Sequence, residues 1–299
     1  MCCSPMQELI FFGKRLWVKR DDLVRIEGVS EHFNGNKARK FYALLHNPNK
    51  IFLSYGGNQS NAMLALSALA YAQKKRFIYI TPAPSQFLRE NPSGNFALAR
   101  EFGAEFIFVD SGTNVLELKN KASAYFKTLP FKEKYFIPQG GDLELAKEGV
   151  MAQCKEIWDF IQKNFATKEV LVFCATGSGV SALALAQAAK ELKCNIQIVP
   201  ILCTKLEGFE KNFTKTLCTN FAFGALKKEV WEMYRALQRL GIEFDLLYDC
   251  PALYALKNAL DSQFFTQNEL EKEWIFIHSG GLLGNLTQIA RLKRKFKTL

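Results

Sequence analysis

The chain has 299 residues, of which 48% are hydrophobic, and it carries a formal net charge of +10 at pH 7. This length suits one large or two ordinary globular domains, and no run reaches the ~18 uninterrupted apolar residues of a membrane-spanning helix. Residues 1–5 lack the basic and apolar regions of a secretory signal, so we expect a cytoplasmic protein with no membrane partner.

The eight cysteines contain no CxxC pair, which argues against a structural metal site or a redox motif. Six of them are dispersed among apolar segments and are predicted to be buried free thiols: Cys154, Cys174, Cys194, Cys203, Cys218 and Cys250. Cys2 and Cys3 are expected in an unstructured end, with a metal or lipid role as the alternative.

The positive charge is dispersed along the chain, except in the basic segment 291–297. A nucleic-acid binder that uses this segment is one alternative function. A basic helix end is also favoured by the helix dipole, and no recognition motif lies beside it. We therefore expect no nucleic-acid partner.

After a short predicted strand at residues 16–23, a helix capped by Asn34 or Asn36 carries the first candidate catalytic side chain, Lys37. At ~100° per residue, Lys37 shares a face with Phe41, Leu44 and Leu45, whereas Arg39, Lys40 and Tyr42 point elsewhere. Burial and the helix dipole both lower the pKa of an amine in this position. Lys37 is therefore a candidate Schiff-base lysine, the alternative being that it extends into water.

Strands and helices then alternate, which predicts an α/β fold of parallel sheets joined by crossover helices. The predicted strands cover residues 51–55, 77–81, 105–110, 135–138, 169–175, 196–202, 244–248 and 274–278. The predicted helices cover residues 62–72, 95–102, 114–126, 143–164, 182–192, 227–240 and 251–260, with a short last helix from 283.

Two glycine-containing turns, 56–61 and 176–181, each follow a strand and open a helix. Free backbone N–H groups at a helix start bind anions, and the second turn adds hydroxyl groups that suit a phosphate. Residues 176–181 match neither a P-loop nor a complete GxGxxG motif, so we predict a phosphate on a smaller cofactor. An ordinary strand-to-helix turn is the alternative.

Polar residues gather where predicted strands end, which is where parallel sheets bind ligands. These residues are Ser60 and Asn61, Thr176 to Ser181, Tyr248 and Asp249, and Ser279. Their convergence predicts one site at one sheet edge.

Five motifs, in this order, resemble the family of 1-aminocyclopropane-1-carboxylate (ACC) deaminases and D-cysteine desulfhydrases, within the tryptophan synthase β group (fold type II) of pyridoxal 5'-phosphate (PLP) enzymes. The motifs are residues 35–40 (GNKARK), 56–61 (GGNQSN), 176–179 (TGSG), 247–249 (LYD) and 278–281 (HSGG). The resemblance implies a large domain (1–45 and 142–299), a small domain (46–141), PLP in the cleft between them, a small amino-acid substrate and a homodimer.

The resemblance also implies a role for each candidate residue. Lys37 would bind PLP and later act as a base, and Tyr248 would be an acid or a nucleophile. The other implied contacts are Asn61 to the ring hydroxyl, Ser60 to the substrate carboxylate, Thr176, Gly177, Ser178 and Gly179 to the phosphate, and Asp249 and Ser279 to the pyridine nitrogen. Asp249 could instead cap a helix. His278 is expected to be a core histidine, with a ligand role as the alternative.

Substrate choice follows from three positions. By the resemblance, deaminases pair an acidic residue after the tyrosine with an apolar residue before Gly-Gly, whereas desulfhydrases have small hydroxyl residues at both. This chain combines Asp249 with Ser279, and Phe223 lies where deaminases carry a second tyrosine. We therefore predict β-elimination from D-cysteine to pyruvate, ammonia and sulfide. The alternatives are ACC deamination to 2-oxobutanoate and ammonia, and a non-catalytic protein that binds a phosphate ligand.

Overall fold

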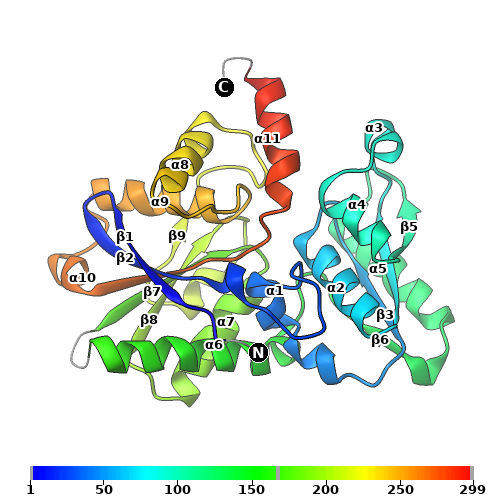
Figure 1. Ribbon diagram of the computed structural model, residues 1–299, viewed down its shortest axis with the longest axis horizontal. Helices are drawn as coiled ribbons and strands as arrows, with labels where there is room; N and C mark the ends of the chain where they lie inside the picture. The colour runs from blue at the N-terminus through cyan, green and yellow to red at the C-terminus, as the bar shows by residue number, and fades with distance from the viewer. Residues whose placement is uncertain (1–2, 166–168, 297–299) are drawn as a thin grey trace.

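The structure, a computed structural model, describes residues 3–165 and 169–296. It contains two sheets, each flanked by helices, which lie in separate halves of the molecule in Figure 1. The larger sheet has the strand order β1 (Met6–Phe11), β2 (Lys14–Lys19), β10 (Glu273–Ile277), β7 (Val170–Thr176), β8 (Ile196–Leu202) and β9 (Leu217–Cys218). The smaller sheet has the order β5 (Glu105–Val109), β4 (Arg76–Pro82), β3 (Ile51–Tyr55) and β6 (Lys134–Phe136). The predicted α/β class is confirmed.

Helices connect these strands in the predicted order, and two short helices that were not predicted, at residues 86–90 and 267–271, lie among them. The helices are α1 (Gly35–Lys40), α2 (Asn61–Ala72), α3 (Gln86–Glu90), α4 (Gly94–Glu101), α5 (Val115–Thr128), α6 (Leu143–Asn164), α7 (Val180–Glu191), α8 (Lys228–Arg239), α9 (Asp249–Asp261), α10 (Gln267–Glu271) and α11 (Gly284–Lys295). Among the described helices, none is both long and apolar enough to cross a membrane.

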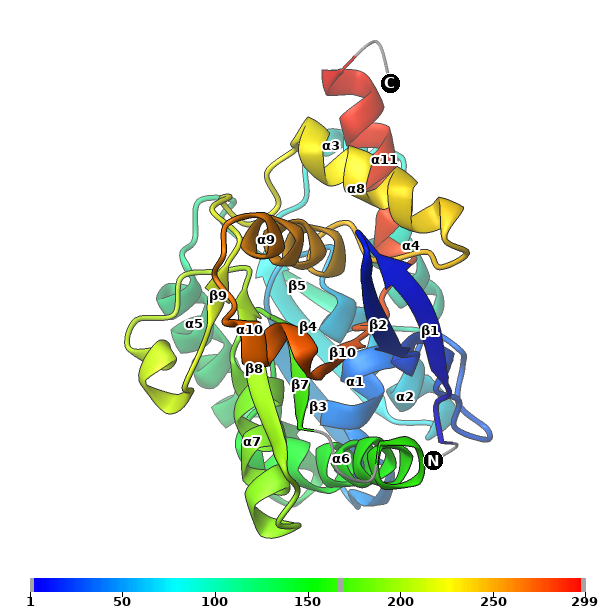
Figure 2. The same cartoon turned by 90° about the vertical axis from the view of Figure 1, so that its left-hand side faces the viewer.

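The larger sheet is buried on both faces, as an apolar parallel sheet requires. Alternate residues of one strand face opposite layers: Phe173 of β7 packs with α8 and α9, and Val172 packs with α6 and α7. Figures 1 and 2 show these helix pairs on opposite sides of the sheet. Strands β2, β10, β7, β8 and β9 pair in parallel, so their carboxyl ends share one edge.

The smaller sheet, entirely parallel, follows the same rule. Phe52 and Tyr79 lie in the core formed with α2, whereas Leu53 and Ile80 pack with α5. The strands of this sheet span residues 51–136, and the domain boundaries at 45/46 and 141/142 remain a prediction.

Two strand predictions need correction. The strand predicted at residues 16–23 is β2, which already ends at Lys19, and it forms an antiparallel hairpin with the unpredicted β1, whose turn places Phe12 and Gly13 at positive φ. The sequence carries no Asn-Gly or Asp-Gly pair that would predict such a turn, and phenylalanine rarely adopts positive φ. The hairpin was therefore not predicted. Residues 244–248 form no strand, because Asp245 Oδ1 accepts hydrogen bonds from the backbone N–H groups of Leu247 and Tyr248 and makes a turn.

The helix predicted from Asn34 is shorter than expected and differs in what it buries. It ends at Lys40, and a 3₁₀ turn (Tyr42–His46) continues the chain. Arg39 and Lys40 do not point away from the core. Both are buried because α1 packs against α6 as well as against the smaller unit, by which we mean the smaller sheet and its helices α2 to α5.

The free-thiol prediction holds for the described cysteines, but their burial differs. Cys154, Cys174, Cys203 and Cys250 are buried, whereas Cys194 is partly buried and Cys218 is exposed. Cys218 lies on the two-residue edge strand β9, where only one neighbour covers it. Cys3 is exposed; Cys2 and Lys297 of the basic segment lie outside the described residues.

Candidate active site

The first and last motifs meet at the carboxyl edge of the larger sheet. Strand β10 ends at Ile277, and the turn after it contacts the start of α1: Asn36 N donates to Ser279 O at 3.0 Å. A Cβ on Gly35 would clash with this carbonyl, so only glycine allows the close approach. Figure 1 shows α1 between the larger sheet and the smaller unit.

Lys37 is the amine at the centre of this region. Its side chain is partly buried, Nζ donates to Asn36 Oδ1 at 2.6 Å, and Nζ lies 5.8 Å from the centre of the Tyr248 ring. Burial lowers the pKa of Lys37 to about 8, although the charges of Asp245 and Asp249 oppose this change. Lys37 therefore does not extend into bulk water, and much of it is neutral near pH 8.

Tyr248 packs against the glycine turn that follows β7. A Cβ on Gly177 would lie 2.8 Å from Tyr248 Cε1, so the ring closes over this turn. Burial, with the nearby charges of Asp245 and the Cys203 thiol, raises the pKa of Tyr248. The phenol keeps its proton at neutral pH and can act as a hydrogen-bond donor or an acid.

The turn after β7 has the features of an anion site. Gly179, at φ +81°, leads into α7, whose first N–H groups point into the turn. Ser178 Oγ accepts from Lys40 Nζ at 3.4 Å, and the buried Ser181 Oγ has no hydrogen-bond partner among the described residues. Thr176 Oγ1 donates instead to Cys174 O at 3.0 Å.

Lys40 is a residue that the sequence analysis missed. It is buried, and burial together with the charge of Lys37 lowers its pKa well below the usual value. An anion at the Ser178 turn would offset this cost by pairing with the ammonium group. The spacing of Lys37 and Lys40, one helical turn apart, was the available signal.

Asp249 lies beside Ser279, as predicted. It is fully buried; Oδ2 accepts from Ser279 N at 3.0 Å, and Oδ1 has no partner among the described side chains and backbone groups. Burial and the charge of Asp245 raise the pKa of Asp249 well above its usual value. The alternative that Asp249 caps a helix is wrong, because it is the first residue of α9 and its carboxylate bonds to Ser279 instead.

Asp245 is a second residue that the sequence analysis missed. Burial raises its pKa to about 7, and its charge influences both Lys37 and Asp249. Asp245 lies in the segment that the sequence predicts to be a strand, where its place between apolar residues indicates no role in a site.

Ser60 and Asn61 bring the smaller unit to the same place. Ser60 caps α2, accepting from Ala62 N at 3.2 Å and Met63 N at 3.3 Å, and its own O–H remains a donor. The Asn61 side chain packs directly against Gly281, in the turn after β10. A cavity with about 290 Å³ of empty space is lined by His32, Asn34, Lys37, Asn61, Leu64, Gly281, Leu282 and Leu283.

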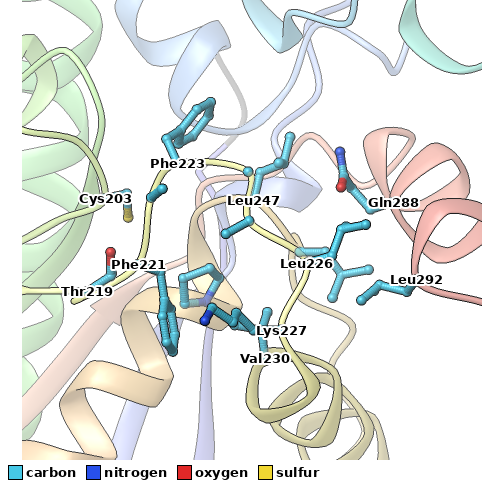
Figure 3. A pocket seen from close by; sticks show the side chains of 15 residues that line it. Cys203, Thr219, Phe221, Phe223, Leu226, Lys227, Val230, Leu247, Gln288 and Leu292 are labelled. Atoms are coloured by element: carbon cyan, nitrogen blue, oxygen red, sulfur yellow. The ribbon is translucent and has the colours of Figure 1, made fainter. Parts of the chain in front are cut away.

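Figure 3 shows a second cavity, with about 420 Å³ of empty space. It lies along the loop 219–227, and Leu247, next to Tyr248 in the chain, lines it. The Phe223 ring of this loop is half exposed and lies 5.1 Å from the Tyr248 ring, centre to centre. Phe223 therefore borders the site but contributes no hydroxyl group.

Comparisons with known proteins were made for the whole chain, and no family model matches it. The chain is 22% identical to the bifunctional D-cysteine desulfhydrase/ACC deaminase of Arabidopsis thaliana mitochondria, over 91% of this chain and 73% of that protein. It is 26% identical to a Thermotoga maritima protein assigned provisionally as an ACC deaminase, over 94% of this chain and 93% of that one. The crystal structure of an ACC deaminase homologue superposes with a TM-score of 0.80 at 22% identity, covering 98% of this chain and 94% of that one.

Proposed function

Because the chain belongs to the family of ACC deaminases and D-cysteine desulfhydrases, we propose that it is a PLP-dependent lyase that releases ammonia from a small amino acid. D-cysteine, eliminated to pyruvate, ammonia and sulfide, is the proposed substrate. ACC, converted to 2-oxobutanoate and ammonia, is the alternative.

The observation that carries this proposal is an amine of lowered pKa accompanied by two buried oxygens without partners. Lys37 is the amine, and the oxygens are Ser181 Oγ at the start of α7 and Asp249 Oδ1 at the start of α9. A PLP site supplies a covalent amine, an anion site for the phosphate and a polar partner for the ring nitrogen, which can be a carboxylate. The residues therefore fit PLP: Lys37 would hold it covalently, Ser178, Ser181, Lys40 and the α7 N–H groups would bind its phosphate, and Asp249 would accept from the ring nitrogen.

When bound, PLP supplies an electron sink that stabilises negative charge on the substrate Cα. The chain supplies the proton transfers. Lys37, with a pKa near 8, can take a proton from Cα at neutral pH, and Tyr248 can donate one because its phenol stays protonated. Ser60, whose hydroxyl lies at the start of α2, would bind the substrate carboxylate.

Phe223 supports D-cysteine over ACC. Opening the ACC ring needs an acid or a nucleophile at the ring carbon, and Phe223 places an apolar ring beside Tyr248 instead of a second hydroxyl. Asp249 favours the opposite choice by the family pattern. We give Phe223 more weight because it borders Tyr248, whereas Asp249 is already bonded to Ser279.

A spectrum and a product assay test this proposal. Purified protein supplied with PLP should show a visible absorption band and should release pyruvate and sulfide in equal amounts from D-cysteine but not from L-cysteine. Lys37→Ala should lose the band and all activity, because no other amine would replace Nζ. Lys119→Ala, which removes an exposed lysine on α5, should keep both.

Three outcomes would contradict parts of the proposal. Release of 2-oxobutanoate from ACC, without sulfide from D-cysteine, would replace the proposed substrate. A band that survives in Lys37→Ala would remove Lys37 from its role. No band in the presence of PLP would leave the phosphate-binding, non-catalytic alternative.

A homodimer and a cytoplasmic location, which the sequence led us to expect, remain proposals. Light scattering of the purified protein at micromolar concentration should give twice the chain mass of 33.9 kDa.

A further inference from the structure

His278 occupies a fully buried position directly after β10. Its ring stacks on Phe244, with centres 4.6 Å apart and planes 13° from parallel. Nε2 lies 2.7 Å from Glu243 O, and Nδ1 lies 3.0 Å from Gly280 N. The prediction of a core histidine is confirmed, but these contacts also determine its protonation.

The partners of His278 assign the tautomer. A carbonyl oxygen only accepts, so Nε2 must carry a hydrogen that it donates to Glu243 O. A backbone N–H only donates, so Nδ1 must present its lone pair to Gly280 N. The imidazole of His278 is therefore neutral and protonated on Nε2.

A third contact, between His278 Nδ1 and the Asp249 carboxyl group, agrees with this tautomer only if a proton lies between the two atoms. Asp249 Oδ2 lies 3.2 Å from His278 Nδ1, and both groups are fully buried. A carboxylate and an imidazole lone pair at this distance would repel each other with no water to screen them. A proton between them turns the contact into a hydrogen bond, with the Nδ1 lone pair shared between Gly280 N–H and the carboxyl group.

We propose that His278 is a positioning residue for Asp249: one proton is shared between Nδ1 of His278 and Oδ2 of Asp249, which leaves Asp249 Oδ1 as the free acceptor of the site. Oδ2 contacts both His278 Nδ1 and Ser279 N, and these two contacts fix the orientation of the carboxyl group. Oδ1, which has no partner among the described residues, is thereby held toward the ligand.

The surrounding charges agree with a neutral pair. Burial lowers the pKa of His278 and raises that of Asp249, so both groups favour their uncharged forms. Asp22 Oδ1 lies 3.9 Å from Nδ1, and Asp22 and Asp21 raise the pKa of His278 while Arg20 lowers it. Arg20 also bonds both oxygens of Asp22, which neutralises that carboxylate.

Two further groups face the carboxyl side of the pair. The charge of Asp245 raises the pKa of Asp249, and Lys37 lies close enough to Asp249 for their charges to interact. An ionised Asp245 thus favours the proton on the pair, whereas an ammonium on Lys37 favours its loss.

One consequence rests on the proposed function. If a protonated ring nitrogen binds at Oδ1, it favours negative charge on Asp249, and the shared proton can move from Oδ2 to Nδ1. One O–H bond breaks and one N–H bond forms, Gly280 N–H gives up its acceptor, and no other reactant is needed. His278 would then let Asp249 change charge without exchanging a proton with water.

Nuclear magnetic resonance of the protein without PLP tests the shared proton. Long-range ¹H–¹⁵N spectra of ¹⁵N-histidine protein, recorded from pH 5.5 to 8.5 and assigned with His32→Asn and His46→Asn, report on each ring nitrogen. His278 should stay neutral and protonated on Nε2 throughout this range. Asp249→Asn should shift the Nδ1 resonance of His278 to that of an acceptor of a single N–H bond.

An unchanged Nδ1 resonance in Asp249→Asn would overturn the proposal, and so would a His278 ring that titrates between pH 5.5 and 8.5. If Asp249→Asn does not fold, the wild-type titration alone decides in the same way. Neither measurement involves PLP, so a failure here is distinct from a failure of the proposed function.

A second readout uses the PLP-loaded protein. Wild type and the control His46→Asn should keep the visible band unchanged from pH 6.5 to 8.5. His278→Asn should make the band pH-dependent and weaken PLP binding about 10-fold or more, as loss of an outer-shell partner does at metal sites. A band and an affinity equal to those of wild type would count against the positioning role. If wild type binds no PLP, only the proposed function fails.

Discussion

At the scale of single residues, the site contains ionisable groups whose pKa values burial has shifted so that their neutral forms are favoured. Lys37 is less protonated than a free lysine, and Asp245 and Asp249 are less ionised than free aspartates. Each shift has the same cause, because the low dielectric of the interior disfavours charge. A bound phosphate and ring nitrogen would add opposite charges to this region.

The lowered pKa of Lys37 predicts the pH dependence of cofactor uptake. Only the neutral amine attacks an aldehyde, so the rate at which the visible band forms after adding PLP should rise with pH up to about 8 and then level off. A lysine of ordinary pKa, ~10.4, would give a rate that still rises tenfold per unit at pH 9. Stopped-flow absorbance from pH 6.5 to 9.5 distinguishes the two profiles.

At the scale of elements, α1 is held in place by buried ion pairs. Arg39 of α1 bonds Glu156 of α6 through two N–H···O contacts of 2.7 Å and pairs with Asp21 at 2.9 Å. Lys19 at the end of β2 pairs with Glu156 at 2.5 Å. These pairs fix a six-residue helix that is too short to be stable alone, and with it the position of Lys37.

Breaking this cluster should destabilise the protein far more than breaking an exposed pair. Arg39→Met removes the guanidinium that pairs with both Asp21 and Glu156, so that Lys19 alone must balance two carboxylates, and should lower the free energy of unfolding by ~3–5 kcal/mol. The control Arg76→Met removes a pair with Glu105 whose side chains are 52% and 46% exposed, and it should change the free energy by less than ~1 kcal/mol. Urea unfolding measures both; similar losses would show that the cluster does not anchor α1.

At the scale of the whole molecule, the site is built from both sheets. Ser60 and Asn61 come from the smaller unit, whereas the anion turn, Tyr248 and Asp249 come from the larger one. A substrate bound by Ser60 and reacting at Lys37 would therefore contact both units. Such an arrangement favours a movement that brings the two units closer together when the ligand binds.

We expect the smaller unit to move as a rigid body toward the larger one when substrate binds. Crystal structures with PLP alone and with PLP plus a non-reacting analogue of D-cysteine measure this movement. After superposition on the larger sheet, strands β3 to β6 should be displaced while their internal geometry stays unchanged. Positions that coincide within coordinate error would contradict the expectation.

The elements were largely predictable because local patterns determine them. Apolar runs of five to seven residues predicted β3, β7 and β8, and the predicted starts of α2 and α6 lie close to the residues that cap them, Ser60 and Asp142. The hairpin turn at Phe12 and Gly13 was missed because phenylalanine rarely adopts positive φ. The turn at Asp245 was missed because this residue lies within an otherwise apolar run, although aspartate commonly forms such turns.

The sequence by itself determined the α/β class, the order of the elements and the candidates Lys37, Tyr248, Asp249 and Ser279, because periodicity and motif spacing are properties of the chain. Only the tertiary structure decided that Lys40 is buried beside Ser178 and that Asp249 contacts His278. Burial and pKa shifts depend on neighbours that lie far apart in the chain. Glu156 and Arg39, 117 residues apart, meet only because α6 crosses beneath α1.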